Sequence, residues 1–196
     1  MNELLVTMGI VSIIAVLLFA TIGVSSQTSK DAKCLSNLRQ IGAVLLQYAG
    51  EHDNYLPAPA NSSHDRILQW PAAIAEYDIR IKKSPVLICP SDTDPNKLTN
   101  GYSYAMNGHL NNGSAKNADG HTVYHPLNLL SVLRPAEMIL FADSIASQVG
   151  RATGPQYLVL RHKNNTHFNA VFLDGHVAFL TPEQAPIEKW RPVLQK

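Results

Sequence analysis

The chain has 196 residues, of which 16% are charged, and its formal net charge is +1. Nucleic-acid binding requires a clustered basic face, so this charge balance excludes nucleic acid as a partner. The length suits one membrane anchor and one domain of about 150 residues.

The chain begins with an apolar run, Leu4 to Val24, which reads LLVTMGIVSIIAVLLFATIGV and contains no charged residue and no proline. About 20 apolar residues in a helix cross the hydrocarbon core of a bilayer. A secretory signal peptide is the alternative, but its apolar region is usually about 7–15 residues and follows a basic flank. No Lys or Arg precedes this run, so we expect residues 1–27 to be a transmembrane and assembly segment.

The helical pattern continues beyond the apolar run. Apolar residues recur at three- and four-residue steps and predict one buried stripe, formed by Leu35, Leu38, Ile41, Gly42, Leu45, Leu46 and Ala49. Lys30, Asp31 and Lys33 are expected mostly off this stripe. We therefore predict an amphipathic half of the helix over residues 28–56. The alternative is a break near Ser25 and Ser26, with a separate helix in the head.

The remaining residues, 57–196, are expected to form a globular head. Residues 56–65 read as a loop, Pro71 to Tyr77 as a short helix with Pro at a first helical position, and Trp70 as a core residue. Residues 107–124 are rich in Gly and Asn and predict a long exposed loop. Four short stretches predict strands: Val86–Cys89, Tyr102–Met106, Met138–Ala142 and Tyr157–Arg161.

A β-hairpin is the clearest local prediction in the head. Phe168–Leu173 and His176–Leu180 are β-rich and flank Asp174-Gly175, a pair that favours a two-residue turn with positive φ at both positions. After it, residues 181–196 carry three prolines and are expected to wrap the surface. The expected fold class is α+β, with a long N-terminal helix packed against a small antiparallel sheet.

The chain contains two cysteines, Cys34 and Cys89, and they do not form a Cys-x-x-Cys pair. If the head lies outside the cytoplasm, a disulfide between them is the simplest interpretation. The alternative is two separate buried thiols.

The sequence predicts no catalytic and no resident metal site. Its eight histidines are scattered, and neither serine-nucleophile motifs nor phosphate-binding glycine loops occur. Zinc held by His162, His176 and Asp174 is one alternative, although the Asp-Gly turn already accounts for Asp174. Calcium is another, because oxygen ligands are available without EF-hand spacing, at Asp92, Asp94, Asp143 and Asp174.

Several motifs together resemble a known family. Glu3 followed by the apolar helix resembles the N-terminal segment of type IV pilins and type II secretion pseudopilins. The other motifs, in chain order, are CLSNLRQIG from Cys34, YLP from Tyr55, CPSD from Cys89, YSYAMN from Tyr102, and His162 with Asp174-Gly175. They are similar to those of prepilin-type proteins with a C-terminal H-X9-DG domain, found in planctomycetes and verrucomicrobia.

The resemblance implies a structural subunit of a pilus-like or type II secretion filament rather than an enzyme. It implies a single-pass inner-membrane protein before assembly, an extracytoplasmic head, and the assembly machinery as partner. Other subunits would pack through the helix, with Gly9, Ala15 and Gly23 permitting close approach. Glu3 would bind the N-terminal amine of a neighbouring subunit, although an acid at a helix N-terminus is favourable on its own. Some pseudopilins also bind calcium in a C-terminal loop.

The sequence also departs from the family pattern. The basic leader of prepilins, counted back from Glu3, would lie upstream of Met1, so leader cleavage and N-methylation are assigned to no residue. Eleven residues separate His162 from Asp174, where the motif has nine. Lys30 and Lys33 follow the apolar run, which by itself predicts a cytoplasmic head; we favour the opposite topology, which the resemblance implies. The alternative function is a membrane-anchored module that binds a glycan or a partner protein through residues 107–124.

Overall fold

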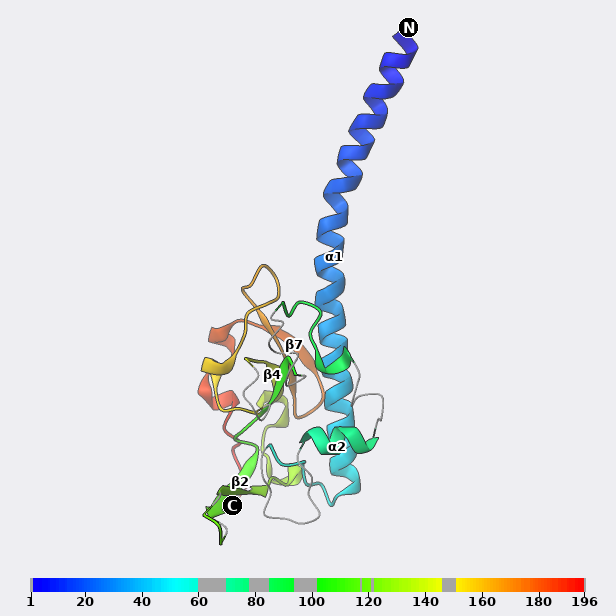
Figure 1. Ribbon diagram of the computed structural model, residues 1–196. Helices are drawn as coiled ribbons and strands as arrows, with labels where there is room; N and C mark the ends of the chain where they lie inside the picture. The colour runs from blue at the N-terminus through cyan, green and yellow to red at the C-terminus, as the bar shows by residue number, and fades with distance from the viewer. Residues whose placement is uncertain are drawn as a thin grey trace.

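The computed structural model describes residues 2–59, 70–77, 85–93, 102–116, 118–120, 122–145 and 151–195. For residues 2–5, 16–26 and 85 it describes the backbone but not the environment of the side chain. The architecture is α+β: one long helix, α1, lies beside a head built on a mixed sheet (Figure 1).

Helix α1 (Asn2–Glu51) contains 50 residues and continues through Ser25 and Ser26 without a break. At 1.5 Å per residue its length is about 75 Å, so it extends well beyond the head (Figure 1). Among the side chains that the structure describes, no helical stretch combines the length and apolarity needed to cross a membrane. Residues 4–5 and 16–24 of the apolar run lie outside that set.

The C-terminal half of α1 packs on the head through one stripe. Leu38, Ile41, Leu45 and Ala49 are fully buried, as the periodicity predicts. Leu35 and Leu46 lie at the edges of the stripe and are half-buried. The helix ends at Glu51, after which Asp53 and Asn54 adopt positive φ and the amide of Asn54 donates to the carbonyl of Ala49 at 2.8 Å.

The head contains a five-stranded sheet in the order β5-β1-β4-β6-β7. The strands are β1 (Tyr104–Asn107), β4 (Ile139–Asp143), β5 (Arg151–Ala152), β6 (Phe168–Phe172) and β7 (Val177–Leu180). All pairings are antiparallel except that of β1 with β5, which is parallel. The predicted purely antiparallel sheet is therefore wrong at this edge.

The sheet is buried on both faces, which explains why its central strands read as continuous apolar runs. One face packs against α1, and Trp70 at the start of α2 (Trp70–Tyr77) lies in this core with its ring 4.9 Å from that of Phe141. The other face is covered by the C-terminal segment, where Trp190 is fully buried. Asn107 joins the layers, because its side-chain amide donates to the carbonyls of Ile139 and Trp190 at 2.8 and 2.9 Å.

Three local predictions need correction. The loop between β6 and β7 consists of Leu173, Asp174 and Gly175, not of two residues. Only Gly175 has positive φ (+88°), whereas the prediction expected positive φ at Asp174 as well. The predicted loop over 107–124 instead contains an exposed hairpin, β2 (Asn111–Lys116) with β3 (Thr122–Pro126). The two remaining predicted strands form 3-10 turns and single bridges, at η2 (Pro85–Leu87) and η6 (Pro155–Tyr157).

Candidate functional site

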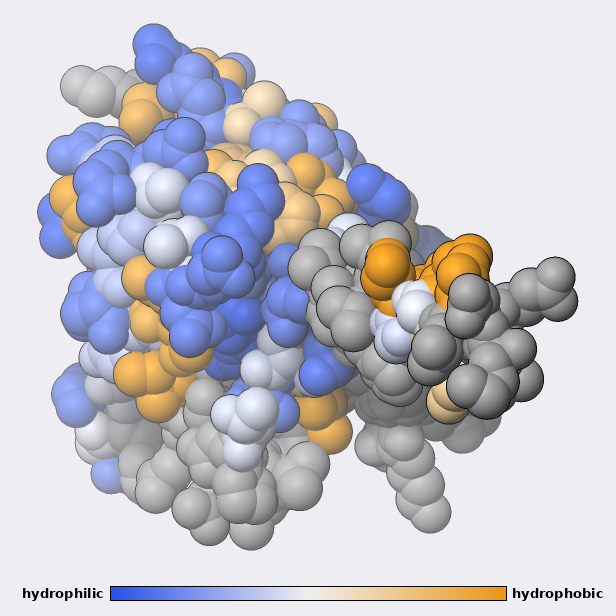
Figure 2. All heavy atoms as spheres, turned by 90° about the horizontal axis from the view of Figure 1, so that it is seen from above, coloured by the Kyte–Doolittle hydropathy of each residue, from blue (hydrophilic) through white to orange (hydrophobic). Residues whose placement is uncertain are grey.

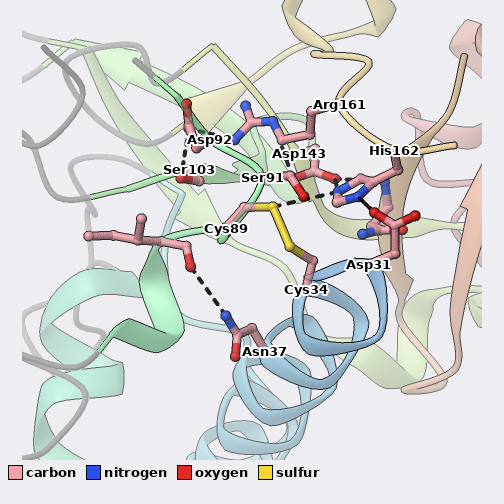
Figure 3. Close-up of a disulfide and its surroundings, with 12 residues drawn as sticks. Asp31, Cys34, Asn37, Cys89, Ser91, Asp92, Ser103, Asp143, Arg161 and His162 are labelled. Carbon is pink, nitrogen blue, oxygen red and sulfur yellow. Dashed lines mark hydrogen bonds and ion pairs between the residues drawn. A yellow bond between two sulfur atoms is a disulfide. The ribbon is translucent and has the colours of Figure 1, made fainter. Parts of the chain in front are cut away.

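A buried polar network lies where α1 meets the head (Figure 3). Helix α1 supplies Asp31 and Cys34, and the segment after η2 supplies Cys89. Strand β4 ends at Asp143, and His162 lies in the segment before β6. Four segments that are distant in the sequence therefore place ionisable or sulfur-containing side chains in one buried region.

The predicted disulfide between Cys34 and Cys89 is present, with their Cα atoms 5.3 Å apart. It fixes α1 to the head across a separation of 55 residues. In the chain-entropy account, closing a loop of this length stabilises the folded state by about 4 kcal/mol. The alternative of two independent buried thiols is excluded.

His162 is the centre of the network. Its Nδ1 lies 2.8 Å from Asp31 Oδ1, and its Nε2 lies 2.9 Å from Asp143 Oδ2 and 3.6 Å from Cys89 Sγ. The imidazole is fully buried, and so is Asp143. Burial alone would lower the pKa of His162, but the hydrogen bonds and charges of Asp143 and Asp31 outweigh burial and raise it.

Arg161 extends the network toward the surface. Its guanidinium pairs with Asp92 through Nη1, and its Nε lies 3.8 Å from Asp143 Oδ1. Asp92 also accepts a hydrogen bond from the Ser103 hydroxyl at 2.7 Å. Because Arg161 is only 5% exposed, removing either partner would leave an uncompensated buried charge, which typically costs about 3–5 kcal/mol.

The two parts of the family motif are not brought together. His162 bridges to His167, just before β6, whereas Asp174 and Gly175 form the turn after it. A strand of five residues separates them by about 17 Å. Asp174 instead accepts a hydrogen bond from the amide of His176 at 3.1 Å. Burial alone would raise the pKa of Asp174, but the hydrogen bonds from His176 outweigh burial and lower it.

The metal candidates predicted from the sequence also do not converge. Asp92 and Asp143 share Arg161, Asp174 lies in the hairpin turn, and Asp94 is outside the described residues. Of the three zinc candidates, His176 and Asp174 lie together at that turn, and β6 separates both of them from His162. The structure groups other ligands: within the part of the chain that it describes, Cys34, Cys89 and His162 place one ligand atom each within 4.8 Å of one another. In the oxidised protein both sulfur atoms are engaged in the disulfide.

The predicted assembly residues lie on the projecting half of α1. A Cβ built at Gly9 would meet nothing within 4 Å, and Ala15 is half-buried. For Glu3 and Gly23 the structure describes the helical backbone but not the surroundings of the residue. Six apolar side chains between them are 50–65% exposed: Val6, Met8, Ile10, Val11, Ile13 and Ile14. Figure 2 shows apolar side chains, in orange, at the surface of the projecting helix.

A polar cleft of about 580 Å³ adjoins the network on its solvent side. Residues from α1 and from two loops line it, namely Gln27, Lys30, Ser91, Asp92, Thr93, Val159, Leu160, Arg161, Asn164 and Asn165. Lys163, Asn164 and Asn165 all have positive φ, which turns the loop sharply at the edge of the cleft.

Sequence reasoning missed two central members of the network. Asp31 was expected mostly off the buried stripe, but it is only 9% exposed and precedes Cys34 by one helical turn on the same face. That spacing was the available signal. Arg161 was assigned to a strand and carried no signal of its own, because its partners Asp92 and Asp143 lie far away in the sequence. Comparison with family models, curated proteins and solved structures finds no match for this chain.

Proposed function

We propose that this chain is a structural subunit of a type IV pilus-like or type II secretion pseudopilus filament. The observation that carries the proposal is the division of α1 into two unlike halves. Residues 31–49 bury one stripe against the head, whereas residues 6–14 project from it with apolar side chains in solvent. A helix with this division fits a subunit whose projecting half packs between copies.

The exposed apolar residues supply a driving force for that assembly. Burying apolar surface stabilises a complex by about 25 cal/mol per Å² removed from water. Large contiguous apolar patches on a soluble surface mark sites of protein or membrane interaction. Within the proposal, lipid covers the run Leu4–Val24 before assembly and other copies cover it afterwards. Glu3 pairs with a neighbouring N-terminal amine, and Gly9, Ala15 and Gly23 allow close helix approach.

The disulfide supports the extracytoplasmic part of the proposal. Cys34 and Cys89 are bonded to each other in a fully buried position. Structural disulfides form and persist in oxidising compartments. In this proposal the protein is anchored once in the inner membrane, and its head lies in the periplasm or, after assembly, at the cell surface.

Crosslinking tests the proposal in the full-length protein. A cysteine at Ile10, in the projecting half of α1, should crosslink between copies under mild oxidation. The matched control is Ser114→Cys on β2, which is exposed at the far end of the head and should not crosslink. Position 10 failing to crosslink, or both positions crosslinking equally, contradicts helix-mediated assembly.

Glu3→Ala tests the role of the N-terminal carboxylate. The variant keeps the apolar run intact, so it should still enter membranes. It should fail to co-assemble with the wild-type chain, because the ion pair to the neighbouring amine is lost. Co-sedimentation of the tagged variant with the untagged wild-type chain measures this. If the variant enters the assembly as readily as the wild-type chain does, the proposed pairing is contradicted.

The polar cleft favours a second candidate, a membrane-anchored module that binds a glycan or partner protein. Lys30, Asn164 and Asn165 offer hydrogen-bonding groups around an opening of about 580 Å³. This candidate predicts a monomer that retains a ligand and gives no crosslink through position 10. The same crosslinking experiment therefore separates the two functions.

A further inference from the structure

The sulfur atoms of Cys34 and Cys89 and the ring of His162 form a compact cluster of potential metal ligands. One ligand atom from each lies within 4.8 Å of the others, and all three residues are fully buried. In the oxidised protein the sulfurs are bonded to each other. We propose that the reduced chain instead binds Zn²⁺ through Cys34, Cys89 and His162, with Asp143 as fourth ligand.

A reductant must first convert the disulfide between Cys34 and Cys89 into two thiols. A water-soluble phosphine gives two electrons to the disulfide and becomes the phosphine oxide, taking its oxygen from water. The two hydrogens of that water go to the sulfurs, so the disulfide yields two thiols. Zn²⁺ then replaces the two thiol protons, which are released to solvent. Metal binding and disulfide formation are therefore mutually exclusive states of the same two sulfur atoms.

The distance between sulfur and nitrogen fits a tetrahedral zinc site. Zn–S bonds of about 2.3 Å and Zn–N bonds of about 2.05 Å place the two ligand atoms about 3.6 Å apart in a tetrahedron. Cys89 Sγ and His162 Nε2 are 3.6 Å apart. The two sulfurs move to non-bonded separation once the disulfide is reduced, which opens the remaining edge. Figure 3 shows both sulfurs next to the imidazole.

Asp31 would act as a positioning residue. It lies 2.8 Å from Nδ1 of His162, on the side of the ring opposite to the sulfur. Histidine ligands of zinc characteristically donate their second ring N–H to a carboxylate, which fixes the tautomer and the ring orientation. Because Asp31 is on α1, one turn before Cys34, the same helix holds a ligand and the group that orients another ligand.

Asp143 completes the coordination. Its Oδ2 lies 2.9 Å from His162 Nε2, a few tenths of an ångström less than the about 3.3 Å expected between the oxygen and nitrogen ligands of tetrahedral zinc. The same oxygen accepts a hydrogen bond from the amide of Asn169 at 2.8 Å, which fixes the carboxylate. Two thiolates neutralise the ion, and Arg161 lies beside Asp143, so the added charge is balanced within the buried region.

Cobalt titration tests the site in the full-length protein held in detergent and reduced by a phosphine. Tetrahedral Co²⁺ with thiolate ligands gives visible bands and a sulfur-to-metal charge-transfer band. We expect these bands to saturate at one Co²⁺ per chain, to vanish on addition of Zn²⁺, and to be absent without the reductant. Absence of the bands from the reduced chain overturns the proposal, and so do equal bands in the oxidised chain.

Variants assign the ligands. Cys34→Ser should abolish the charge-transfer band, His162→Gln should weaken Co²⁺ binding by more than tenfold, and Asp31→Asn by about tenfold. His176→Gln, at the exposed hairpin turn, is the matched control and should bind as wild type. Circular dichroism confirms that each variant is folded. Unchanged Co²⁺ affinity in a folded His162→Gln variant overturns the assignment.

A measurement on the wild-type chain covers the case in which His162→Gln does not fold. The chemical shift of bound ¹¹³Cd²⁺ depends on how many sulfur ligands surround it. A shift typical of two sulfurs supports the site, and a shift typical of oxygen and nitrogen ligands alone overturns it. The inference does not rest on a filament role, because it concerns only the folded head before its thiols are oxidised.

Discussion

At the scale of single residues, Gly42 marks the closest approach of α1 to the sheet. A Cβ built on Gly42 would lie 2.7 Å from Cγ2 of Val171 on β6. Valine is branched at Cβ and has few alternative rotamers, so it has little freedom to yield. The absence of a side chain at this position therefore lets the helix and the strand pack in direct contact.

Gly42→Ala should destabilise the protein despite the better helix propensity of alanine. Overpacking costs about 1–3 kcal/mol, and the propensity gain returns about 1 kcal/mol, so the net loss is about 1 kcal/mol. Chemical denaturation measures it. Gly50→Ala is the control, because the built Cβ there meets nothing within 4 Å, and it should be neutral or stabilising.

A second substitution checks the cause. Adding Val171→Ala to Gly42→Ala provides space for the new methyl group, so the double variant should lose less stability than the sum of the two single losses. Strict additivity would show that the cost of Gly42→Ala does not arise from contact with Val171.

The sequence predicted residue roles well where they follow from local periodicity. Leu38, Ile41 and Ala49 were identified because a helix returns to the same face every three or four residues. The disulfide followed from there being only two cysteines. The ionic partners of His162 did not follow, because Asp31 and Asp143 lie 131 and 19 residues away and only the completed fold joins them.

At the scale of elements, a hydrogen bond joins the end of α1 to the end of α2. The hydroxyl of Tyr77 donates to Glu51 Oε2 at 2.7 Å. Burial, followed by the bond to Glu51, raises the pKa of Tyr77 to about 12. The bond from Tyr77, with a second from Gln47, lowers the pKa of Glu51. The contact therefore requires a neutral tyrosine and an ionised glutamate.

This bond predicts a pH dependence of stability at both ends of the scale. Tyr77 has a raised pKa when folded, so its contribution is complete below pH 10 and is lost as the pH rises from 10 toward 12. Glu51 has a lowered pKa, so its contribution is present above pH 4.5 and is lost as the pH falls below that value.

Tyr77→Phe measures the effect by thermal unfolding. The variant removes only the hydroxyl, so its difference in stability from wild type should be largest between about pH 5 and 9 and shrink at both extremes. The control is Tyr157→Phe, at η6 away from the α1–α2 contact, whose difference should not follow this profile. A difference for Tyr77→Phe that stays constant across the pH range would contradict the assigned bond.

Elements were predicted where burial produces a continuous apolar run and missed where pairing is decided by distant partners. Met138–Ala142 was identified because β4 is buried on both faces. The polar strands β2 and β3 gave no such pattern, since they pair mainly with each other and face solvent. Residues 157–160 are apolar, but they pair with Asp143 at the end of β4 and with Ser144 only at single positions. Their composition therefore resembled a strand that the fold does not complete.

At the scale of the whole molecule, the described contacts that hold the head together lie along α1 from Gln27 onward and within the head itself. Among the side chains that the structure describes, Gln27 is the first beyond residues 6–15 to bond to the head: its amide donates to Ser91 at 3.4 Å and, within α1, to Asp31 at 2.9 Å. From there the buried stripe, the disulfide and both cores follow along the chain. The side chains of residues 6–14, the described part of the projecting half, are exposed.

Removal of residues 1–26 should leave a folded, monomeric head. Helix fraying at the new end would cost about 1 kcal/mol at most, which corresponds to a fall in Tm of about 2–4 °C for a chain of this size. Thermal unfolding and sedimentation measure both properties. A matched truncation that starts at Asn37 also removes Asp31 and Cys34, and it should not fold cooperatively. Loss of cooperative unfolding already at residue 27 would contradict this division of the helix.

The bond between Cys34 and Cys89 has a mechanical consequence. When the two ends of the chain are pulled apart, tension that travels down α1 reaches Cys34 and crosses directly to Cys89. The 54 residues between these cysteines, 35–88, then carry none of the load, because the covalent bond is the shorter path. The packed half of α1 and the whole of α2 are shielded in this way, and only the segments outside the loop can be stretched while the bond persists.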